Sequence, residues 1–418
     1  MTLAAHGPDL ATSHARATHP IVYLILVLPF GALSGFLTTA IAYELSQAGL
    51  SVEQVAGLVA FSFLPHTWKF LWAPVADATF TRKGWYRSMA VVSALGFFAT
   101  AAIPATPAAL PWMYLVVGVS NIAITLLVMS IESLMAHDSP PDQRGRVAGW
   151  FQAGNMIGGG IGGGLGLWLT RTLPEAWMAG AVLALGTVLC TLALKPLREP
   201  PPMASATGRP LRDMFEALRD LWQVLRTRSG WLAALICLMP LGTGAAMGLG
   251  AAVADDWHAS ATTVATVGGV LSGLVAALGC WVAGPLCDRM DRKTAYLLFG
   301  LTQSACALAM ALAPRTETMF IVFSLIYAFT GGLAYTGYTA VVLEVIEGGA
   351  AATKYTMFSS LANMPIAYMI MIDGWAHGRF GAGGMLYTEA ALSTLGAVVF
   401  AVVAAVAINR RRPVAAAA

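Results

Sequence analysis

Lys69 is the residue whose position in the sequence is chemically most unusual. It lies in the apolar stretch of residues 53–77, eight residues before Asp77. Eight residues of α-helix span about 12 Å. A charged group that deep in an apolar segment is costly unless it meets an opposite charge. We therefore expect Lys69 to contact an anionic part of a ligand; the alternatives are a structural pair with an internal carboxylate, or an amine that reaches the nearest polar boundary.

Two further residues have the chemistry to carry a proton beside Lys69. His66 precedes it by one helical turn, on the same face. It is a candidate for proton coupling and ligand contact, although its position favours the alternative of a hydrogen-bonded packing residue. Glu132 is the best carboxylate for proton coupling, but its place near the end of the apolar stretch 111–136 also suits a gate or a solvated residue.

Polar residues in later apolar stretches form a second set of candidate ligand contacts. Gln152 and Asn155 stand at the start of the glycine-rich stretch GNMIGGGIGGGLG. That stretch predicts close helix packing, because a phosphate-binding loop would need a strand, a loop and a lysine. A polar and aromatic group could contact sugar or peptide atoms, although tyrosines also serve as interface anchors. It consists of Tyr335, Tyr338, Tyr355, Ser359 and Asn363.

The remaining acidic and cysteine residues predict neither catalysis nor a metal site. Glu44, Asp255, Asp256, Glu344, Glu347 and Asp373 lie near the ends of apolar stretches, where we expect them to be solvated. The five cysteines lack CxxC spacing, so neither a zinc site nor a disulfide framework is expected. The motifs HExxH and GxSxG are absent as well. We expect no cofactor, no metal and no enzymatic activity.

Composition indicates that these residues are positioned by membrane helices. Of 418 residues, 57% are hydrophobic and 11% are charged, against roughly a quarter charged in soluble domains. In lipid the backbone must satisfy its own hydrogen bonds, and the apolar stretches lack the alternation of a barrel, so the chain should be all-α. A net charge of +3 without a basic stripe leaves nucleic-acid binding unsupported.

Apolar stretches long enough to span a bilayer recur about 12 times. They are placed near residues 20–44, 53–77, 87–106, 111–136, 146–170, 176–194, 230–254, 262–287, 294–313, 318–346, 355–375 and 385–408. Assigning the even-numbered connections and both termini to the cytoplasm puts every Lys and Arg there except Lys69, Arg171, Arg315 and Arg379. This distribution satisfies the positive-inside rule.

The longest polar interruption divides the chain into two six-helix bundles. Residues 20–195 and 230–408 form the bundles, and 196–229 form a cytoplasmic linker with an amphipathic helix. Residues 1–19, which lack a signal-peptide core, and residues 409–418 are short cytoplasmic tails. The stretch GPLCDRMDRK from Gly284 has a weaker counterpart, APVADATFTRK from Ala73, about half a chain away. Parallel duplication of six helices explains both observations.

This repeated stretch resembles the loop motif of major facilitator transporters. The pattern G-x-x-x-D-R-x-x-R-[RK] is matched by Gly284, Asp288, Arg289, Arg292 and Lys293. The resemblance implies a fold of two six-helix halves and a charged latch that closes the cytoplasmic side. The alternative is that these charges only fix the orientation of the helices in the membrane. In the first copy Asp77 is kept, Ala78 replaces the arginine, and Arg82 and Lys83 supply the charge. That latch is expected to be looser.

Two segments resemble AmpG-type muropeptide permeases and the related acetyl-coenzyme A transporters. LPHTWKFLWAPVAD, residues 64–77, is similar to L-P-Y-x-x-K-F-x-W-A-P-x-x-D, and AATKYTMFSSL, residues 351–361, to A-T-Q-Y-A-L-L-S-S-L. The resemblance implies a permease of the bacterial inner membrane that takes up anhydro-muropeptides with protons. In the fourth span, Asn121 and Thr125 stand where the family has carboxylates. This departure puts proton coupling in question.

We therefore expect a secondary active transporter that moves an amphipathic, anionic small molecule by alternating access. No ATPase motif is present, so an ion or solute gradient should drive it. Acyl-coenzyme A or siderophore transport and drug export are the alternatives; Lys69 disfavours cationic drugs. The partners of the transporter should be the solute, the lipid bilayer and protons, and the transporter should act as a monomer. The alternative from a different functional class is a membrane-embedded enzyme, or a sensor built on a transporter scaffold.

Overall fold

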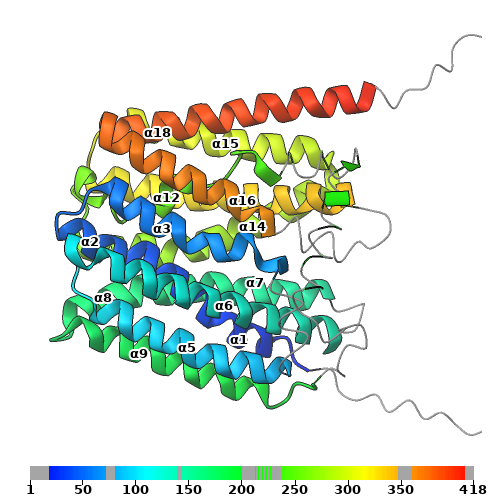
Figure 1. Cartoon of the computed structure of the whole chain (residues 1–418). Coiled ribbons are helices and arrows are strands. Elements are labelled where there is room, and N and C mark those ends of the chain that lie inside the picture. Colours follow the sequence, from blue (N-terminus) through cyan, green and yellow to red (C-terminus); the bar gives the residue numbers. More distant parts are fainter. Residues whose placement is uncertain are drawn as a thin grey trace, which may run out of the picture.

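The computed structural model describes residues 18–71, 81–138, 144–199, 237–346 and 360–409, together with isolated residues between 212 and 235. The regular structure of these described residues is helical, without strands. Figure 1 shows long helices running side by side, with the start of α1 and the end of α18 at the same end of the bundle. We call this end the terminal face and the opposite end the far face. The all-α prediction is confirmed.

The helices of residues 18–199 follow the predicted spans in order. They are α1 (Ile21–Gly35), which continues through η1 (Phe36–Ile41) into α2 (Ala42–Gln47), then α3 (Val52–Thr67), α5 (Arg82–Ala102), η2 (Pro107–Ala109) leading into α6 (Leu110–Asp138), α7 (Arg144–Gly160) with η4 (Ile161–Leu165) and α8 (Gly166–Thr172), and α9 (Ala176–Cys190) with η5 (Thr191–Leu194).

The second half contains longer helices and one broken segment. Its elements are α12 (Ala245–Gly248), η6 (Ala254–Trp257), α13 (Ala261–Thr263) with η7 (Val264–Leu271) and α14 (Ser272–Arg289), α15 (Arg292–Leu312), α16 (Glu317–Ile346) and α18 (Asn363–Asn409). Within α18, Gly381 has φ 70° and ψ −173°, which breaks the helix into two arms. Figure 1 shows the first arm running to the far face and the second returning to the terminal face.

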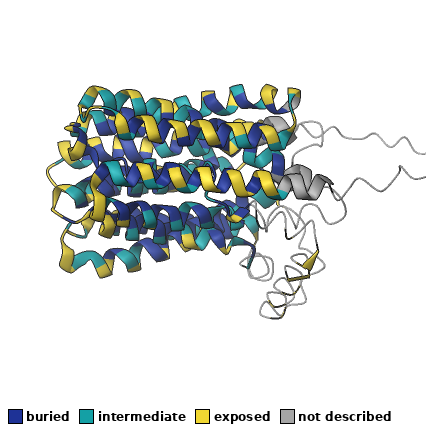
Figure 2. Cartoon of the chain, turned by 90° about the horizontal axis from the view of Figure 1, so that it is seen from above, coloured by how far each residue is buried: buried dark blue, intermediate teal, exposed yellow. Residues whose placement is uncertain are grey.

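The sides of the bundle carry the apolar surface that a membrane protein needs. Figure 2 shows exposed residues along the outer helices and buried residues within the bundle. Large apolar side chains are among the exposed ones, including Leu95, Trp112, Leu185, Trp281 and Leu312. Seven of the described helical segments are long and apolar enough to cross a membrane. The chain is therefore a multi-pass membrane protein.

The glycine-rich stretch packs against the first span, as predicted. A Cβ atom at Gly162 would lie 1.9 Å from the carbonyl oxygen of Ala32, and one at Gly35 would lie 2.0 Å from that of Gly159. Only glycine permits such close approach of two helix backbones. The π-helical turns η1, η4 and η7 also contact one another, so this packing extends from the first half into the second.

The two halves meet at the far face. The Ser46 hydroxyl donates to the carbonyl of Ala252 at 2.7 Å, and the Gln47 amide donates to Asp255 at 2.7 Å. Beside them α3 packs against the first arm of α18, where a Cβ at Gly374 would lie 2.2 Å from that of Ala56. These contacts close the far face between the halves.

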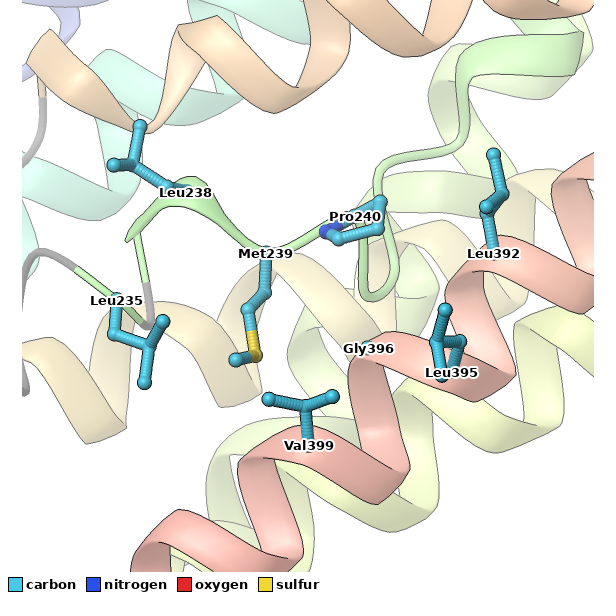
Figure 3. Close-up of a pocket in the computed structure, with 8 residues that line it drawn as sticks. All are labelled: Leu235, Leu238, Met239, Pro240, Leu392, Leu395, Gly396 and Val399. Carbon is cyan, nitrogen blue, oxygen red and sulfur yellow. The ribbon is translucent and has the colours of Figure 1, made fainter.

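The predicted seventh span is not a continuous helix. Residues 239–244 leave the helical conformation, and Gly242 and Gly244 have φ angles of 69° and 68°. Pro240 lacks the N–H that a helix would need, and glycine tolerates the left-handed conformation. Figure 3 shows this segment crossing the second arm of α18. An apolar groove lies between them, lined by Leu235, Leu238, Met239, Pro240, Leu392, Leu395, Gly396 and Val399.

Side chains from neighbouring helices bind the backbone groups that the break exposes. The amide of Ala246 donates to Glu389 at 2.8 Å, and the amide of Gly242 donates to Ser393 at 3.3 Å. Tyr368 and Tyr296 donate to the carbonyl groups of residues 238 and 241, at 2.7 Å and 3.3 Å. Irregular backbone at membrane depth is tolerated where protein groups satisfy it in this way. The apolar stretch predicted near 230–254 therefore contains a break in its helix that the sequence analysis did not anticipate.

Candidate functional site

Lys69 and Glu132 form an ion pair between α3 and α6. Helix α3 ends at Thr67, two residues after Pro65, and a turn at Trp68 precedes Lys69. The Lys69 amine lies 2.7 Å and 2.8 Å from the two carboxylate oxygens of Glu132. The side chains are 14% and 35% exposed, respectively. Of the arrangements considered from the sequence, the structure adopts the pair with an internal carboxylate.

This pairing removes most of the cost of placing two charges inside the bundle. Each charge neutralises the other, and the lysine donates to both oxygens of its partner. The larger exposure of Glu132 leaves that carboxylate open to exchange protons or partners. The pair can therefore open without stranding both groups in an apolar environment.

His66 lies beside the pair in a more enclosed place. Its Nδ1 atom is 2.8 Å from the hydroxyl of Thr125, which is itself 2.6 Å from the carbonyl oxygen of Asn121. The rings of Phe30 and Phe63 pack against the imidazole, with centroids 5.3 Å and 6.5 Å away. These contacts match the hydrogen-bonded packing alternative, and they bring the two positions that lack family carboxylates next to His66.

The other predicted ligand contacts lie apart from this cluster or outside the described residues. Gln152 is partly buried on α7, and its amide nitrogen has no partner among the described residues. Asn155, also on α7, is half-buried. Tyr338 contacts the Cys237 thiol at 3.0 Å, and Tyr335 is 52% exposed.

The last part of the predicted aromatic group is only partly described. The Asn363 amide donates to the carbonyl of Ser360 at 3.2 Å. Tyr355 and Ser359 lie outside the described residues. The aromatic group as a binding surface therefore stays a prediction.

The loop-motif residues stand at helix ends near the terminal face. Arg82 and Lys83 begin α5, and their backbone amides donate to the carboxylate of Glu199, at 2.5 Å for Arg82. The Lys83 amine donates to the carbonyl of Leu197 at 2.5 Å. The sequence analysis missed Glu199, which lies in the turn-rich stretch after the sixth span.

The second copy of the motif spans the connection between α14 and α15. Gly284, Asp288 and Arg289 lie toward the end of α14, and Arg292 and Lys293 begin α15. The carboxylate of Asp291 caps α15 by accepting from the amide of Thr294 at 3.0 Å. Asp77 of the first copy lies outside the described residues. The latch role of both copies stays a prediction.

The carboxylates expected to be solvated fall into two groups. Glu44 pairs with Arg171 at 2.8 Å, and Asp256 pairs with His377 at 2.7 Å, with the carboxylate side chains 27% and 38% exposed. For these far-face residues the expectation of contact with water is consistent with the structure. Glu344 and Glu347 lie where the structure describes no side chains.

Asp373 contradicts that expectation. Its exposure is 0%, because the first arm of α18 packs between α3 and other helices of the second half. Glu389, on the second arm, is 2% exposed and was not singled out from the sequence. Its position eight residues after Gly381, mirroring Asp373 eight residues before it, is a signal that a search for paired acids across a helical hairpin would find.

Comparisons with known proteins agree with this architecture. Residues 20–367 match the family model described as Major Facilitator Superfamily. Anhydromuropeptide permeases of Escherichia coli strain K12 and of Escherichia coli O157:H7 are each 25% identical over 387 residues. Each alignment covers 84% of this chain and 74% of the relative.

Solved structures with similar folds are transporters of several solutes. The nucleoside transporter NupG aligns with a TM-score of 0.69 at 14% identity, over 92% of this chain and 98% of NupG. The Escherichia coli xylose transporter XylE, in a partially occluded inward-open conformation, aligns at 0.67 with 14% identity, over 90% and 96%. A POT family transporter in complex with a thioalcohol-conjugated peptide aligns at 0.71 with 10% identity, over 94% and 96%. These similarities show the fold alone.

Proposed function

The chain belongs to the major facilitator superfamily, and we propose that it is a secondary active permease that imports an anionic, anhydromuropeptide-like solute together with protons. The observation that carries this proposal is the match over 84% of the chain to anhydromuropeptide permeases. The ion pair of Lys69 and Glu132 supplies a cation inside the bundle for such a solute. We place the protein in the bacterial inner membrane with both termini in the cytoplasm, as the distribution of Lys and Arg indicates.

Lys69 is the proposed anion contact. In the structure its charge is neutralised by Glu132 at 2.7 Å. A carboxylate of the solute would compete with Glu132 for the same amine. Recognition of an anion by a lysine already held inside the bundle avoids much of the cost of burying a new cation at each binding event.

Glu132 is the proposed link between the solute and a proton. A proton on Glu132 removes its charge and leaves Lys69 without a counter-ion. The solute anion then restores neutrality, so proton binding and solute binding strengthen each other. Because Glu132 is the more exposed partner, it is the one that water can protonate. This coupling needs neither of the acids that Asn121 and Thr125 replace.

The contacts at the far face suit the alternating-access cycle of the superfamily. Ser46 and Gln47 of the first half bind residues 252 and 255 of the second, and α3 packs against α18. Separation of these contacts would open the far face, and their formation would close it. The glycine-lined surfaces of η4 and η7 would let the halves move against each other.

Uptake by the purified protein in proteoliposomes tests the proposal. Labelled anhydromuropeptide is supplied outside, with and without an inward proton gradient, and a Glu132→Gln variant is measured in parallel. We expect the gradient to drive accumulation by the wild-type protein. The variant should keep exchange of solute without a gradient and lose the accumulation.

The control and the contradicting outcomes separate substrate from coupling. Glu175→Gln removes an exposed acid at the far face and should leave uptake unchanged. Binding and uptake of an acyl-coenzyme A or a siderophore, with none of anhydromuropeptide, would contradict the substrate. Accumulation of muropeptide that is indifferent to the proton gradient would contradict the coupling.

A further inference from the structure

Asp373 and Glu389 form a buried acidic pair that the proposed mechanism does not use. Asp373 is 0% exposed and Glu389 is 2% exposed. The two carboxylates interact electrostatically, and both interact with the hydroxyl of Tyr327. Neither carboxylate oxygen of Asp373 has a hydrogen-bond partner among the described residues. A carboxyl group in this state calls for a physical explanation, since buried polar groups are nearly always paired.

The hairpin of α18 brings the two acids to the same depth. Each is eight residues from Gly381, which stands at the turn between the arms. Eight residues of helix span about 12 Å. Both carboxyl groups are therefore about 12 Å below the far face, inside the apolar part of the bundle.

A basic partner is missing from the described surroundings of the pair. Tyr327 on α16 and Cys306 on α15 are the titratable groups that interact with it. On α3, Glu53 approaches the first arm at Gly378, and it adds no positive charge. Two nearby bases are engaged elsewhere. His377 binds Asp256 at 2.7 Å, and the guanidinium of Arg315 stacks on Trp257 at 4.2 Å.

The hydrogen bonds indicate which acid carries a charge. Glu389 accepts the backbone N–H of Ala246 at 2.8 Å, and Tyr327 faces it, although without a hydrogen bond of standard geometry. These dipoles stabilise an ionised Glu389. No described residue donates a hydrogen bond to Asp373, and a second negative charge beside the first would be unstable at this depth.

From this geometry we propose that Asp373 and Glu389 are a proton-binding site, in which Asp373 holds the proton while the far face is closed. The proton forms a bond to one oxygen of Asp373, comes from water at the far face, and returns to water when the bond breaks. Nothing else is oxidised, reduced or transferred. The inference goes beyond the function of the Lys69 pair and rests on the proposed transport function only for its role in the cycle.

Unpartnered groups nearby support an exchange site over a merely structural pair. Gln303 is 2% exposed, and in the described part of the chain neither polar atom of its amide group has a hydrogen-bond partner. Its nitrogen and the ring of Tyr327 both border Gly244, at 3.0 Å and 3.9 Å from where a Cβ would stand. Polar groups therefore continue from the acidic pair to the break in the seventh span. Polar groups that lack hydrogen-bond partners are expected where water can enter in another conformation of the protein.

A proton suits this site better than a metal cation. A hard cation such as Ca²⁺ needs at least six oxygen ligands. The described residues contain no group of three or more acidic, histidine or cysteine side chains that could hold a metal. A proton needs one oxygen and a neighbouring acceptor, which the pair provides.

The packing of α3 on α18 explains how the proton would act on the conformation. Gly374, next to Asp373, is in close contact with Ala56 of the first half. When the halves separate there, far-face water reaches Asp373 and stabilises its charged form. When they close, an ionised Asp373 would be stranded in an apolar environment. Protonation therefore favours the closed far face, and loss of the proton favours the open one.

Two measurements on the full-length protein in lipid, without solute, test this inference. Difference infrared spectroscopy between H₂O and D₂O detects the C=O stretch of a protonated carboxyl group at neutral pH. We expect this band in the wild-type protein and its loss in Asp373→Asn. Glu175→Gln, which removes an exposed acid, is the control and should retain the band. A band that is absent from the wild type, or unchanged in Asp373→Asn, would overturn the site.

The second measurement is the distance between spin labels at Glu53→Cys and Phe380→Cys, on α3 and α18 at the far face. Raising the pH should shift the wild-type protein toward longer distances. Asp373→Asn should abolish this shift, and Asp373→Glu should restore it. A pH shift that persists in Asp373→Asn would contradict the proposal, and so would a shift driven by Na⁺ at constant pH.

Solute uptake distinguishes failure of this inference from failure of the proposed function. If the infrared band and the pH shift behave as expected while muropeptide is not transported, the proton site stands and the substrate is wrong. If muropeptide uptake is driven by a proton gradient equally well in Asp373→Asn and wild type, the proposed function stands and this site has no role in coupling.

Discussion

The two halves of the molecule contain different kinds of buried ionisable pair. In the first half, Lys69 and Glu132 neutralise each other at 2.7 Å, and Glu132 keeps 35% of its side chain exposed. In the second half, Asp373 and Glu389 are both acids, whose ionised forms would repel each other, and they are at most 2% exposed. The first arrangement is stable with both groups ionised and can exchange a partner. The second is stable only when a proton is present, so it suits a conformational sensor better than a ligand contact.

The position of each pair follows the same division. Lys69 lies toward the terminal face, near the loop motif, whereas Asp373 lies about 12 Å from the far-face turn. Solute recognition and control of the far-face contacts are therefore assigned to separate charges in separate halves. Substitutions that disturb one pair and leave the other intact test whether the two pairs have these separate roles.

The largest effect is expected for Lys69→Ala. The variant loses the proposed anion contact and leaves Glu132 without its partner, so solute uptake should fall about 10- to 100-fold, equivalent to 1.5–3 kcal/mol for a charged hydrogen bond. The initial rate of uptake in proteoliposomes measures it. Lys69→Arg, which keeps the charge, is the control, and normal uptake by well-expressed Lys69→Ala would exclude the anion contact.

Replacing a tightly packed glycine by alanine should destabilise both halves to a similar extent. A Cβ at Gly162 would lie 1.9 Å from a carbonyl oxygen of α1, and one at Gly332 would lie 2.1 Å from a carbonyl oxygen of α14. Gly162→Ala and Gly332→Ala should each destabilise the protein by about 1–3 kcal/mol, because the backbones must move apart. Thermal unfolding in detergent measures this loss.

A third glycine provides the matched control for packing. No atom of the described residues lies within 4 Å of a Cβ built at Gly186, so Gly186→Ala should cost nothing. Alanine has the higher helix propensity, so equal destabilisation at all three positions would mean that close contact at the two tight positions is not the cause. A large loss at one of the two tight positions alone would show that the halves are packed differently.

Neutralising one acid in each half should affect stability in opposite directions. Glu132→Gln removes half of an ion pair and should cost about 1–2 kcal/mol, reduced by the exposure of that side chain. Asp373→Asn replaces a buried carboxyl group that must bind a proton with an amide that is always neutral, so the melting temperature should stay unchanged or rise. The two variants are compared at neutral pH without solute. A loss for Asp373→Asn as large as that for Glu132→Gln would show that both acids are structural.

The smallest effect is expected for His66→Phe. The imidazole packs between Phe30 and Phe63 and is hydrogen-bonded to Thr125. Loss of one such bond costs about 0.5–1.5 kcal/mol, so uptake should change by less than about tenfold. The dependence of uptake on pH should keep its midpoint. A displaced midpoint would make His66 a proton carrier and move part of the coupling beside Lys69.

The sequence by itself determined the class of the protein and most of its helices. Long apolar stretches have one stable solution in lipid, so the all-α fold and the order of spans could be read directly. Lys69 stood out for the same reason, because a charge in an apolar stretch needs a partner. The glycine-rich stretch likewise predicted close helix contact, and the structure places it against α1.

Only the tertiary structure decided which polar groups meet. Lys69 and Glu132 are 63 residues apart, and no local rule selects that carboxylate over another. The break after Pro240 depends on side chains of α15 and α18 that bind the freed backbone groups. Asp373 lies near the end of an apolar stretch, which in the sequence resembles a solvated position. Its burial arises because α3 of the other half covers that turn of the helix, and such coverage is a property of the packed bundle.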